Sequence, residues 1–399
     1  AQGSPGEEAE DEGSEAAARR RRRQKRKRKQ PNEDELLENL DEAFGWLQGI
    51  EPQDQSWLHF AMFNFLEQQG EKTGAWAQLQ LANQLQRKVT EYLPEQDERL
   101  LQMVRQVFPP AEHRQEMSPQ DQQQLQLVLG GGLGLRDETP IFILGMARSG
   151  STLLEQILAS HSWGHGAGED TAFAPLLSDL IAAVQQHGFA AEVFHEYARK
   201  YLDRMQAKAA EQGAGPPPPK RIVDKMLRNV WHVGYIQMVL PQACILQPVR
   251  HPLDVLLSCY KQPFEGRGTP WAWDLDDIAE TLERVEEVMA HWQDFYPGKI
   301  LRISYEHLVQ SPEAAMQGVL RHCGMPWEPA VLDFHSNPRS VSTASLAQVR
   351  QKLYASSIGK WQAYKTELEP IRRRLAPLID RYEQEWDLAT ASDRKHEEL

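Results

Sequence analysis

The sequence has few cysteines, no long apolar run and no overall excess of positive charge, and each lack excludes a class of protein. Its three cysteines, Cys244, Cys259 and Cys323, are odd in number and none lie close together in the 399 residues. This spacing gives no readable disulfide framework and no CxxC metal site, so each is expected to be a small buried apolar residue. No stretch approaches the roughly 20 apolar residues of a membrane-spanning helix, so we expect no span in this chain.

Charge is distributed unevenly along the chain. The net charge is −13, yet residues 1–32 hold ten basic and six acidic side chains. The remaining residues, 34 basic and 51 acidic, form an acidic body, which argues against broad nucleic-acid binding. Any anionic ligand must therefore be held by a local site.

Residues 1–32 are predicted to be a disordered charged tail, because they contain almost no apolar side chains. The basic run at 19–29 fits a nuclear-localisation signal, a membrane-surface patch or a merely solvated tail, and these alternatives stay open. The first residue is Ala rather than Met, so the chain is expected to be a fragment that lacks any upstream signal peptide or membrane anchor.

Residues 33–130 have the periodicity of helices, with apolar side chains three or four positions apart. These series are Leu36, Leu37, Leu40, Phe44 and Leu47, followed by Leu58, Ala61 and Phe65. Gly70, Ala75, Leu79 and Ala82 then follow at the small-residue spacings of a tetratricopeptide repeat. No second copy is convincing, so a single repeat-like unit and a plain helical hairpin both remain open. Residues 131–138 are predicted to be a flexible glycine-rich joint.

Residues 139–390 have a different pattern. Short apolar, β-rich runs at 140–144, 243–249 and 299–304 alternate with helical segments, including 255–260 and 275–295. Strands that alternate with helices predict an α/β domain with a central parallel sheet. A Pro- and Gly-rich surface loop is expected at 213–220, and the tail 357–386 again has helical periodicity.

A glycine-rich turn joins the first strand of this domain to its first helix. Gly145–Thr152 reads Gly-Met-Ala-Arg-Ser-Gly-Ser-Thr, the GxxxxG skeleton of a nucleotide phosphate loop. Backbone N–H groups and a helix N-terminus at such a turn bind phosphate. Ser151 stands where an ATPase or GTPase has its lysine, so a Mg-dependent kinase or hydrolase fits poorly. A single 5′-phosphate that carries a compact anhydride group fits, with Arg148 as a fixed cation.

A second candidate anion site follows the strand predicted at 243–249. Arg250 stands at the carboxyl end of that strand, where open α/β sheets bind ligands. Ser258, eight residues on in the next helix, can add a hydroxyl donor. An arginine and a serine suit a dianionic phosphate.

These two segments resemble those of sulfotransferases that use 3′-phosphoadenosine 5′-phosphosulfate (PAPS). Residues 140–161 look like the segment that binds the 5′-phosphosulfate, and residues 250–258 look like the 3′-phosphate segment. The resemblance covers about residues 139–365 and points to the tyrosylprotein and tetratricopeptide-linked sulfotransferases. It implies a P-loop-like sulfotransferase fold preceded by an all-α segment, with PAPS as sulfuryl donor. The implied donor-binding residues are Arg148, Ser149, Gly150, Ser151, Thr152, Arg250 and Ser258.

Sulfuryl transfer needs a base, cations over the moving sulfonate and a group that stabilises the leaving oxygen; it needs no metal in principle. By resemblance, Glu169 is the base and Lys225 contacts the bridging oxygen and the sulfonate. Arg148 and Ser345 would assist at the sulfonate. No metal-ligand cluster is readable, so no metal is expected.

Further site residues are implied by weaker matches. Tyr305 matches a tyrosine that contacts the nucleotide, and Lys360 matches a lysine that binds its phosphate. His161 and His165 are alternative bases, because many small-molecule sulfotransferases use histidine. His161 is expected instead to shape the turn after its helix.

The resemblance also implies an acceptor and a compartment. A tyrosine in a protein or peptide is the leading acceptor, with a carbohydrate or a small phenol as alternatives. Met226 replaces an acidic residue that is common in tyrosylprotein enzymes, which puts tyrosine specificity in doubt. A Golgi-lumen location follows if the tyrosylprotein resemblance holds and an anchor lies upstream, and a cytoplasmic one otherwise. A homodimer is a further expectation, and an inactive helical scaffold is the noncatalytic alternative.

Overall fold

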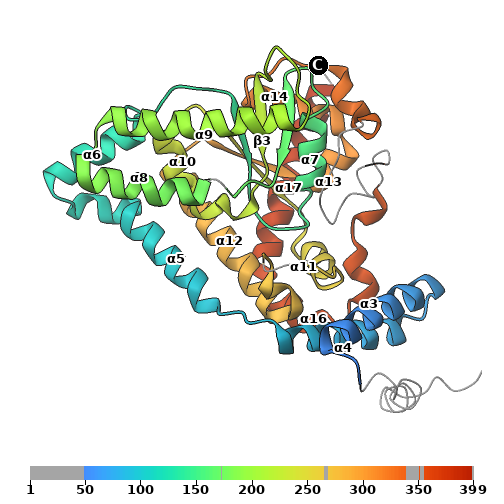
Figure 1. The fold of residues 1–399 in the computed structure, drawn as a ribbon. Coiled ribbons are helices and arrows are strands. Elements are labelled where there is room, and N and C mark those ends of the chain that lie inside the picture. Colours follow the sequence, from blue (N-terminus) through green and yellow to red (C-terminus); the bar gives the residue numbers. More distant parts are fainter. Residues whose placement is uncertain (1–48, 172, 265–267, 338–349, 351–354, 398–399) are drawn as a thin grey trace, which may run out of the picture. The chain divides into compact units, whose positions relative to one another are not determined.

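The computed structural model describes residues 49–171, 173–264, 268–337, 350 and 355–397 (Figure 1). The chain divides into two compact units, residues 1–85 and 86–399, and the dividing point lies within helix α4 (Lys72–Val89). No helix among the described residues combines the length and the hydropathy that crossing a bilayer requires.

The described part of the first unit is a pair of helices, α3 (Pro52–Gln69) and the first turns of α4. The hydroxyl of Ser56 donates to the carbonyl oxygen of Ala82 at 2.8 Å, which fixes the two helices to each other. The prediction of helix in this region is confirmed. The tetratricopeptide-like character stays a prediction.

The buried face of α3 differs from the one that the spacing suggested. Phe60 and Phe63 are buried, whereas Leu58 is 38% and Phe65 is 62% exposed. Both sets of residues recur at helical spacing, so the spacing predicts a helix but does not indicate which of its two apolar faces is buried. The contact with α4 makes that choice.

The second unit contains helices and a sheet. Its helices are α5 (Pro94–Val107), η2 (Ala111–Glu116), α6 (Pro119–Leu129), α7 (Ser151–Leu158), α8 (Phe173–His187), α9 (Ala191–Glu211), η3 (Leu227–Trp231), α10 (Val233–Val239), α11 (Pro252–Tyr260), η4 (Pro270–Trp273), α12 (Leu275–Phe295), α13 (Tyr305–Gln310), α14 (Pro312–His322), η5 (Pro329–Ser336), η6 (Ala355–Ser357), η7 (Lys360–Tyr364), α16 (Glu369–Arg374) and α17 (Ala376–Glu397). Its strands are β1 (Pro140–Ile143), β2 (Gly164–Gly168), β3 (Arg221–Asp224), β4 (Cys244–Val249) and β5 (Ile300–Ser304).

The five strands form one parallel sheet in the order β2-β3-β1-β4-β5. Strand β1 is central, and the chain builds β2 and β3 on one side of it before it crosses to β4 and β5. The predicted α/β class with a central parallel sheet and a preceding helical segment is confirmed. The strands predicted at 140–144, 243–249 and 299–304 match β1, β4 and β5 to within one residue at each end.

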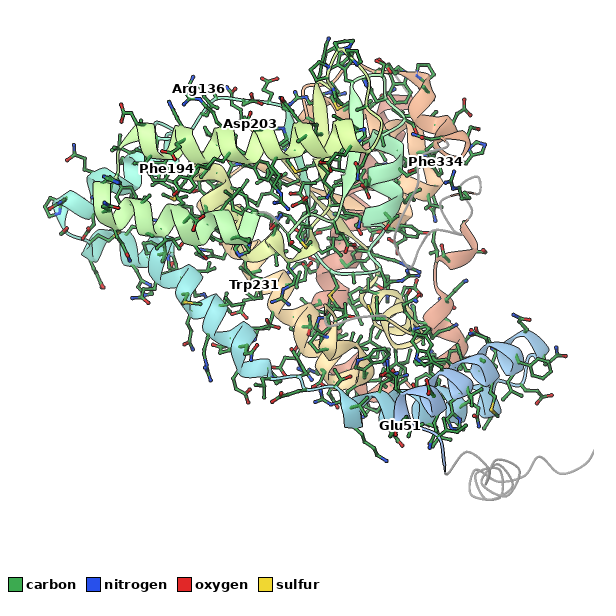
Figure 2. All side chains as sticks on the ribbon, in the orientation of Figure 1. Glu51, Arg136, Phe194, Asp203, Trp231 and Phe334 are labelled. Atoms are coloured by element: carbon green, nitrogen blue, oxygen red, sulfur yellow. A yellow bond between two sulfur atoms is a disulfide. The ribbon has the colours of Figure 1, made fainter. Side chains whose placement is uncertain are left out.

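Helices cover both faces of the sheet, which is why the central strand β1 is apolar and buried along its whole length. Ile141 and Ile143 of β1 pack in one core with α7, α14 and Phe334 of η5. On the other face, Phe142 stacks on Tyr201 of α9, with ring centroids 5.5 Å apart. Figure 1 shows α8 and α9 side by side, and Phe334 is labelled among the side chains of Figure 2.

The cysteines do not all behave as predicted. Cys244 and Cys323 form a disulfide across 79 residues of sequence, so the prediction of three unpaired cysteines is wrong for these two. The spacing could not reveal the bridge, because only the packing of α14 against the sheet brings the residue after α14 to the start of β4. Cys259 is the buried free thiol that was predicted, and burial raises its pKa to about 12.

The glycine-rich segment before β1 packs closely rather than forming a loose joint. A Cβ atom on Gly134 would lie 2.4 Å from the carbonyl oxygen of Met238, so only glycine lets the segment approach α10 this closely. Leu133 is buried, and the Leu135 N–H donates to the carbonyl oxygen of Val239 at 2.9 Å.

Candidate active site

The carboxyl ends of all five strands meet at one edge of the sheet, because every strand is parallel. Glu169 follows β2, Lys225 follows β3, the loop with Arg148 follows β1, Arg250 follows β4 and Tyr305 follows β5. In the order of the sheet, the predicted site residues therefore run from Glu169 at one end to Tyr305 at the other. Arg148 and Arg250 flank the switch point between β1 and β4, where such sheets bind ligands.

The loop after β1 is held in an unusual conformation. Gly150 has φ 101°, and a Cβ there would lie 2.7 Å from Cδ2 of Tyr305. Arg148 has φ 66°, a conformation that non-glycine residues rarely adopt and that the surroundings must enforce. The Ser149 hydroxyl supports the turn by donating to the carbonyl oxygen of Met146 at 2.7 Å. Helix α7 starts immediately after this turn, so its first N–H groups have no intrahelical acceptor.

The two predicted phosphate segments are in direct contact, although about a hundred residues separate them. Nε of Arg148 donates to Oγ of Ser258 at 3.0 Å. Nη1 of Arg250 donates to the carbonyl oxygen of Arg148 at 3.4 Å. The structure thus brings both arginines and the serine to the same place.

The guanidinium of Arg250 lies over the ring of Tyr305, 4.8 Å from its centroid. Its Nε is buried and has no hydrogen-bond partner in the part of the chain that the structure describes. A buried donor without a partner is costly in the absence of a ligand, so this atom points to an anion.

Other predicted nucleotide contacts lie nearby or cannot be placed. The hydroxyls of Tyr305 and Ser357 are 2.6 Å apart. Lys360 is exposed at the start of η7. Ser345 lies outside the described residues, so its role stays a prediction.

Glu169 and Lys225 form an ion pair at the other end of the edge, with Nζ 2.6 Å from Oε1. The lysine side chain is 1% exposed, whereas the glutamate side chain is 52% exposed. One partner is therefore fixed inside the protein, and the other faces the solvent from which an acceptor would arrive.

The backbone around Glu169 is held by its neighbours. Oε1 of buried Glu155 accepts the Gly168 N–H at 2.8 Å, and the Lys225 N–H donates to the carbonyl oxygen of Gly168 at 3.0 Å. Nζ of Lys208 donates to the carbonyl oxygen of Glu169 at 3.2 Å and to Asp170 at 2.8 Å. The position of the carboxylate is therefore defined although its tip is exposed.

The two histidines that were alternative bases lie elsewhere. His161 precedes β2 and His165 is its second residue, so both are near the amino end of the strand, away from the edge that carries Glu169. His161 is 2% exposed, its Nε2 is 2.8 Å from the carbonyl oxygen of Pro326, and its Nδ1 accepts the Trp163 N–H. These contacts confirm that His161 shapes the turn after α7.

Sequence reasoning missed several buried carboxylates near this edge, among them Asp254 and Asp224. Asp254 lies one helical turn after Arg250, a spacing that could have linked the two. Asp224 accepts a hydrogen bond from the Tyr201 hydroxyl at 2.7 Å, and burial raises its pKa to about 7. No sequence signal linked residues 201 and 224, which come from α9 and β3.

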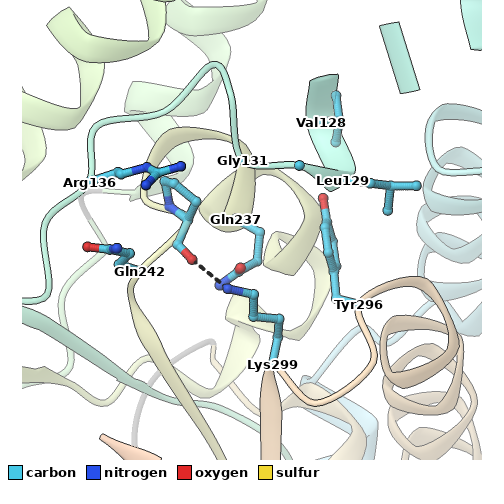
Figure 3. A pocket seen from close by; sticks show the side chains of 10 residues that line it. Val128, Leu129, Gly131, Arg136, Gln237, Gln242, Tyr296 and Lys299 are labelled. Atoms are coloured by element: carbon cyan, nitrogen blue, oxygen red, sulfur yellow. Dashed lines mark hydrogen bonds between the residues drawn. The ribbon is translucent and has the colours of Figure 1, made fainter. Parts of the chain in front are cut away.

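A surface hollow of about 190 Å³ lies at the opposite edge of the sheet, among residues that precede β4 and β5 (Figure 3). Arg136, Gln242 and Lys299 line it, and Nζ of Lys299 donates to the carbonyl oxygen of Pro241 at 3.0 Å. None of the predicted site residues line this hollow. Among the described residues, no group of three His, Cys, Asp or Glu side chains is placed to hold a metal ion.

Residues 140–329 match the model of the sulfotransferase family. This part of the chain is similar to the sulfotransferase family over 190 of the 399 residues. The resemblance expected from the two phosphate segments is therefore confirmed, and the matched residues include the carboxyl ends of all five strands.

Similar proteins include an uncharacterised relative and a protein-tyrosine sulfotransferase. The chain is 37% identical over 255 residues to an uncharacterised protein of Aquifex aeolicus (strain VF5). This alignment covers 60% of this chain and 32% of that protein. It is 24% identical over 247 residues to a protein-tyrosine sulfotransferase of Drosophila melanogaster, covering 57% and 47% respectively. The chain thus spans about a third to a half of the length of these relatives. A solved sulfotransferase domain from the curacin biosynthetic pathway superposes with a TM-score of 0.42 at 19% identity, covering 61% of this chain and 99% of that domain.

Proposed function

We propose that this chain transfers the sulfuryl group of PAPS to an acceptor hydroxyl, with a protein tyrosine as the first acceptor to test. The observation that carries the proposal is the meeting of the two phosphate segments, through Arg148 with Ser258 and Arg250 with the Arg148 carbonyl. One nucleotide with a phosphate at each end of its ribose fits a site in which a phosphate loop and a second arginine are neighbours.

The donor would lie across the β1–β4 switch point. Its 5′-phosphosulfate would accept from the N–H groups at the start of α7 and from Arg148. Its 3′-phosphate would accept from Arg250 and Ser258, which suit a dianion. The buried Nε of Arg250, which has no partner among the described residues, supports this assignment. The absence of a lysine at position 151 fits a ligand that lacks a γ-phosphate.

The transfer itself would use the ion pair of Glu169 and Lys225. The acceptor oxygen attacks sulfur while its proton passes to the carboxylate of Glu169. The bond between sulfur and the bridging oxygen breaks, and adenosine 3′,5′-bisphosphate leaves with the electron pair. Lys225, whose charge is fixed in the protein interior, stabilises that oxygen. Arg148, with Ser345, would cover the sulfonate.

The acceptor is the finer part of the proposal. Relatives named as protein-tyrosine sulfotransferases, at 21–24% identity, favour a tyrosine over a carbohydrate or a small phenol. The half-exposed carboxylate of Glu169 suits a large acceptor, because it does not lie at the bottom of an enclosed pocket. Incubation with labelled PAPS and a tyrosine-containing peptide library tests this, with phenylalanine-substituted peptides as controls. Label on a carbohydrate or a small phenol instead would redirect the acceptor assignment.

Donor choice can be tested without an acceptor. Adenosine 3′,5′-bisphosphate is expected to raise the melting temperature more than ADP with Mg²⁺ does, because only the former offers a 3′-phosphate to Arg250. The reverse order would indicate a nucleotide kinase or hydrolase and would overturn the proposal.

The base can be tested with a matched pair of substitutions. Glu169→Gln is expected to lower turnover by about 10²–10⁴ and to leave the affinity for adenosine 3′,5′-bisphosphate unchanged. Glu138→Gln is the control, since Glu138 is also an exposed carboxylate paired with a buried cation, Arg221, at the opposite edge of the sheet. Turnover should survive in the control. Loss of product binding in a folded Glu169→Gln protein would contradict the assigned role.

A further inference from the structure

Asp254 is a buried carboxylate of α11 that no step of the proposed transfer uses. Its side chain is fully shielded from solvent. Oδ2 accepts the Gly359 N–H at 2.6 Å, and Oδ1 accepts the Trp361 N–H at 3.0 Å. These N–H groups lie at the start of η7, so a carboxylate from another helix caps that turn, where donors lack partners and negative charge is favoured.

The same carboxylate lies beside the guanidinium of Arg250, with Oδ2 3.8 Å from Nη2. That Nη2 donates to the carbonyl oxygen of Ser357 at 2.6 Å. The Ser357 hydroxyl is in turn 2.6 Å from the hydroxyl of Tyr305, whose ring lies under the guanidinium. Residues 357–361 are therefore tied to Arg250 both directly and through Asp254.

A ring contact also holds residues 357–361 near Arg250. The rings of His251 and Trp361 stack with centroids 5.4 Å apart and planes inclined by 10°. His251 is the residue that follows Arg250, so the chain on both sides of the proposed phosphate contact is fixed to the same segment. Asp254 is at the centre of this arrangement, since it bonds the segment and faces the arginine.

We propose that Asp254 is a positioning residue for the 3′-phosphate end of the donor site. By holding residues 357–361 against Arg250, it fixes the guanidinium and Lys360 relative to each other and so sets how tightly a nucleotide 3′-phosphate binds. This inference rests on the proposed function. It assigns to Asp254 no contact with the nucleotide itself.

A carboxylate is needed here rather than any polar group of the same shape. Its two oxygens accept from two backbone donors at once and face a cation. In Asp254→Asn, one oxygen becomes an NH₂ group, which would face a backbone N–H or the Arg250 guanidinium. The substitution keeps the volume and reverses the polarity at one position, so it releases the segment without creating a cavity.

The test compares two nucleotides by calorimetry on the wild-type chain and on Asp254→Asn. Adenosine 3′,5′-bisphosphate is expected to lose affinity by about tenfold or more. Adenosine 5′-monophosphate, which has no 3′-phosphate, is expected to change by less than about twofold, because the loop after β1 is untouched. Asp97→Asn is the control for removal of a buried carboxylate, since Asp97 is 7% exposed on α5 and accepts from the Tyr92 hydroxyl; it should change neither affinity.

The outcomes separate this inference from the proposed function. A wild-type chain that does not prefer the bisphosphate contradicts the proposed function. A wild-type preference that Asp254→Asn retains, or an equal loss for both nucleotides, overturns the role of Asp254 and leaves the function standing. If Asp254→Asn does not fold, hydrogen exchange on the wild type decides. The Gly359 and Trp361 amides should be protected and slowed further by the bisphosphate alone, and fast exchange that neither nucleotide alters would overturn the role.

Discussion

The two ends of the candidate site are built in different ways. At the end formed by β1, β4 and β5, the donor end, side chains from segments far apart in sequence contact one another: Arg148 with Ser258, and Arg250 with Tyr305. At the end formed by β2 and β3, the proposed acceptor end, Glu169 pairs with Lys225, and the Glu169 carboxylate is half exposed. The donor end is fixed in advance, and the acceptor end is open.

This difference matches what each end would recognise under the proposed function. A nucleotide donor is a single molecule of known shape, so groups that are held in place before it arrives lose little entropy when it binds. An acceptor hydroxyl on a protein arrives with varied surroundings, and a carboxylate that is firmly placed but accessible suits it. Four substitutions test this contrast between the two ends, and their expected effects decrease in the order given.

Lys225→Met should have the largest effect. It removes the buried charge of the acceptor end and should lower turnover by about 10³, because an ionic group aimed at a developing negative charge is worth several kcal/mol. Affinity for adenosine 3′,5′-bisphosphate should change far less, since the donor end stays intact. Single-turnover kinetics and calorimetry measure the two quantities. Equal losses in both would mean that the ends do not act separately.

Cys323→Ser should come next, through stability rather than chemistry. The bridge to Cys244 closes a long loop between β4 and α14, and its loss should cost about 2–5 kcal/mol of unfolding free energy. The melting temperature in the absence of reductant measures this. Reductant should destabilise the wild type but not the variant, and Cys259→Ala should keep the sensitivity of the wild type. A wild type that is indifferent to reductant would contradict the bridge.

Gly150→Ala should damage the donor end by a steric route. The new methyl group would lie 2.7 Å from the Tyr305 ring at a backbone φ of 101°, so the ring must move from beneath Arg250. Affinity for adenosine 3′,5′-bisphosphate should fall about tenfold. Gly213→Ala is the matched control, because it has φ 91° with open space around it. It should lower stability by about 1 kcal/mol and leave binding unchanged.

Asp224→Asn should have the smallest effect, visible as a pH dependence at the acceptor end. Burial raises the pKa of Asp224 to about 7, so the folded state binds a proton that the unfolded state has released. The wild type should therefore lose stability relative to Asp224→Asn as pH rises, by roughly 1 kcal/mol between pH 6 and pH 8. Melting temperatures of both proteins across this range measure it. A constant difference would mean that Asp224 does not titrate there.

Local pattern predicted much of the fold and of the donor end. The strands β1, β4 and β5 are short apolar runs and the helix α12 has helical periodicity, and the residues after these strands must meet once the sheet is parallel. What local pattern could not predict depends on contacts between distant segments. Three such contacts are the Cys244–Cys323 disulfide and the hydrogen bonds of Tyr201 with Asp224 and of Gly359 with Asp254. Only the packing of segments far apart in the sequence brings these partners together. The prediction of the buried face of α3 was wrong for a related reason, because apolar residues on two faces of this helix recur at the same spacing.

The order of the strands along the chain has a practical consequence. Strands β2 and β3 are consecutive in sequence as well as adjacent in the sheet, so one uninterrupted stretch, residues 164–225, carries Glu169, Lys225 and the helices between them. The groups assigned to the nucleotide come before or after that stretch. Under the proposed function, exchange of this one stretch would replace the part that meets the acceptor and would leave the residues assigned to the nucleotide unchanged.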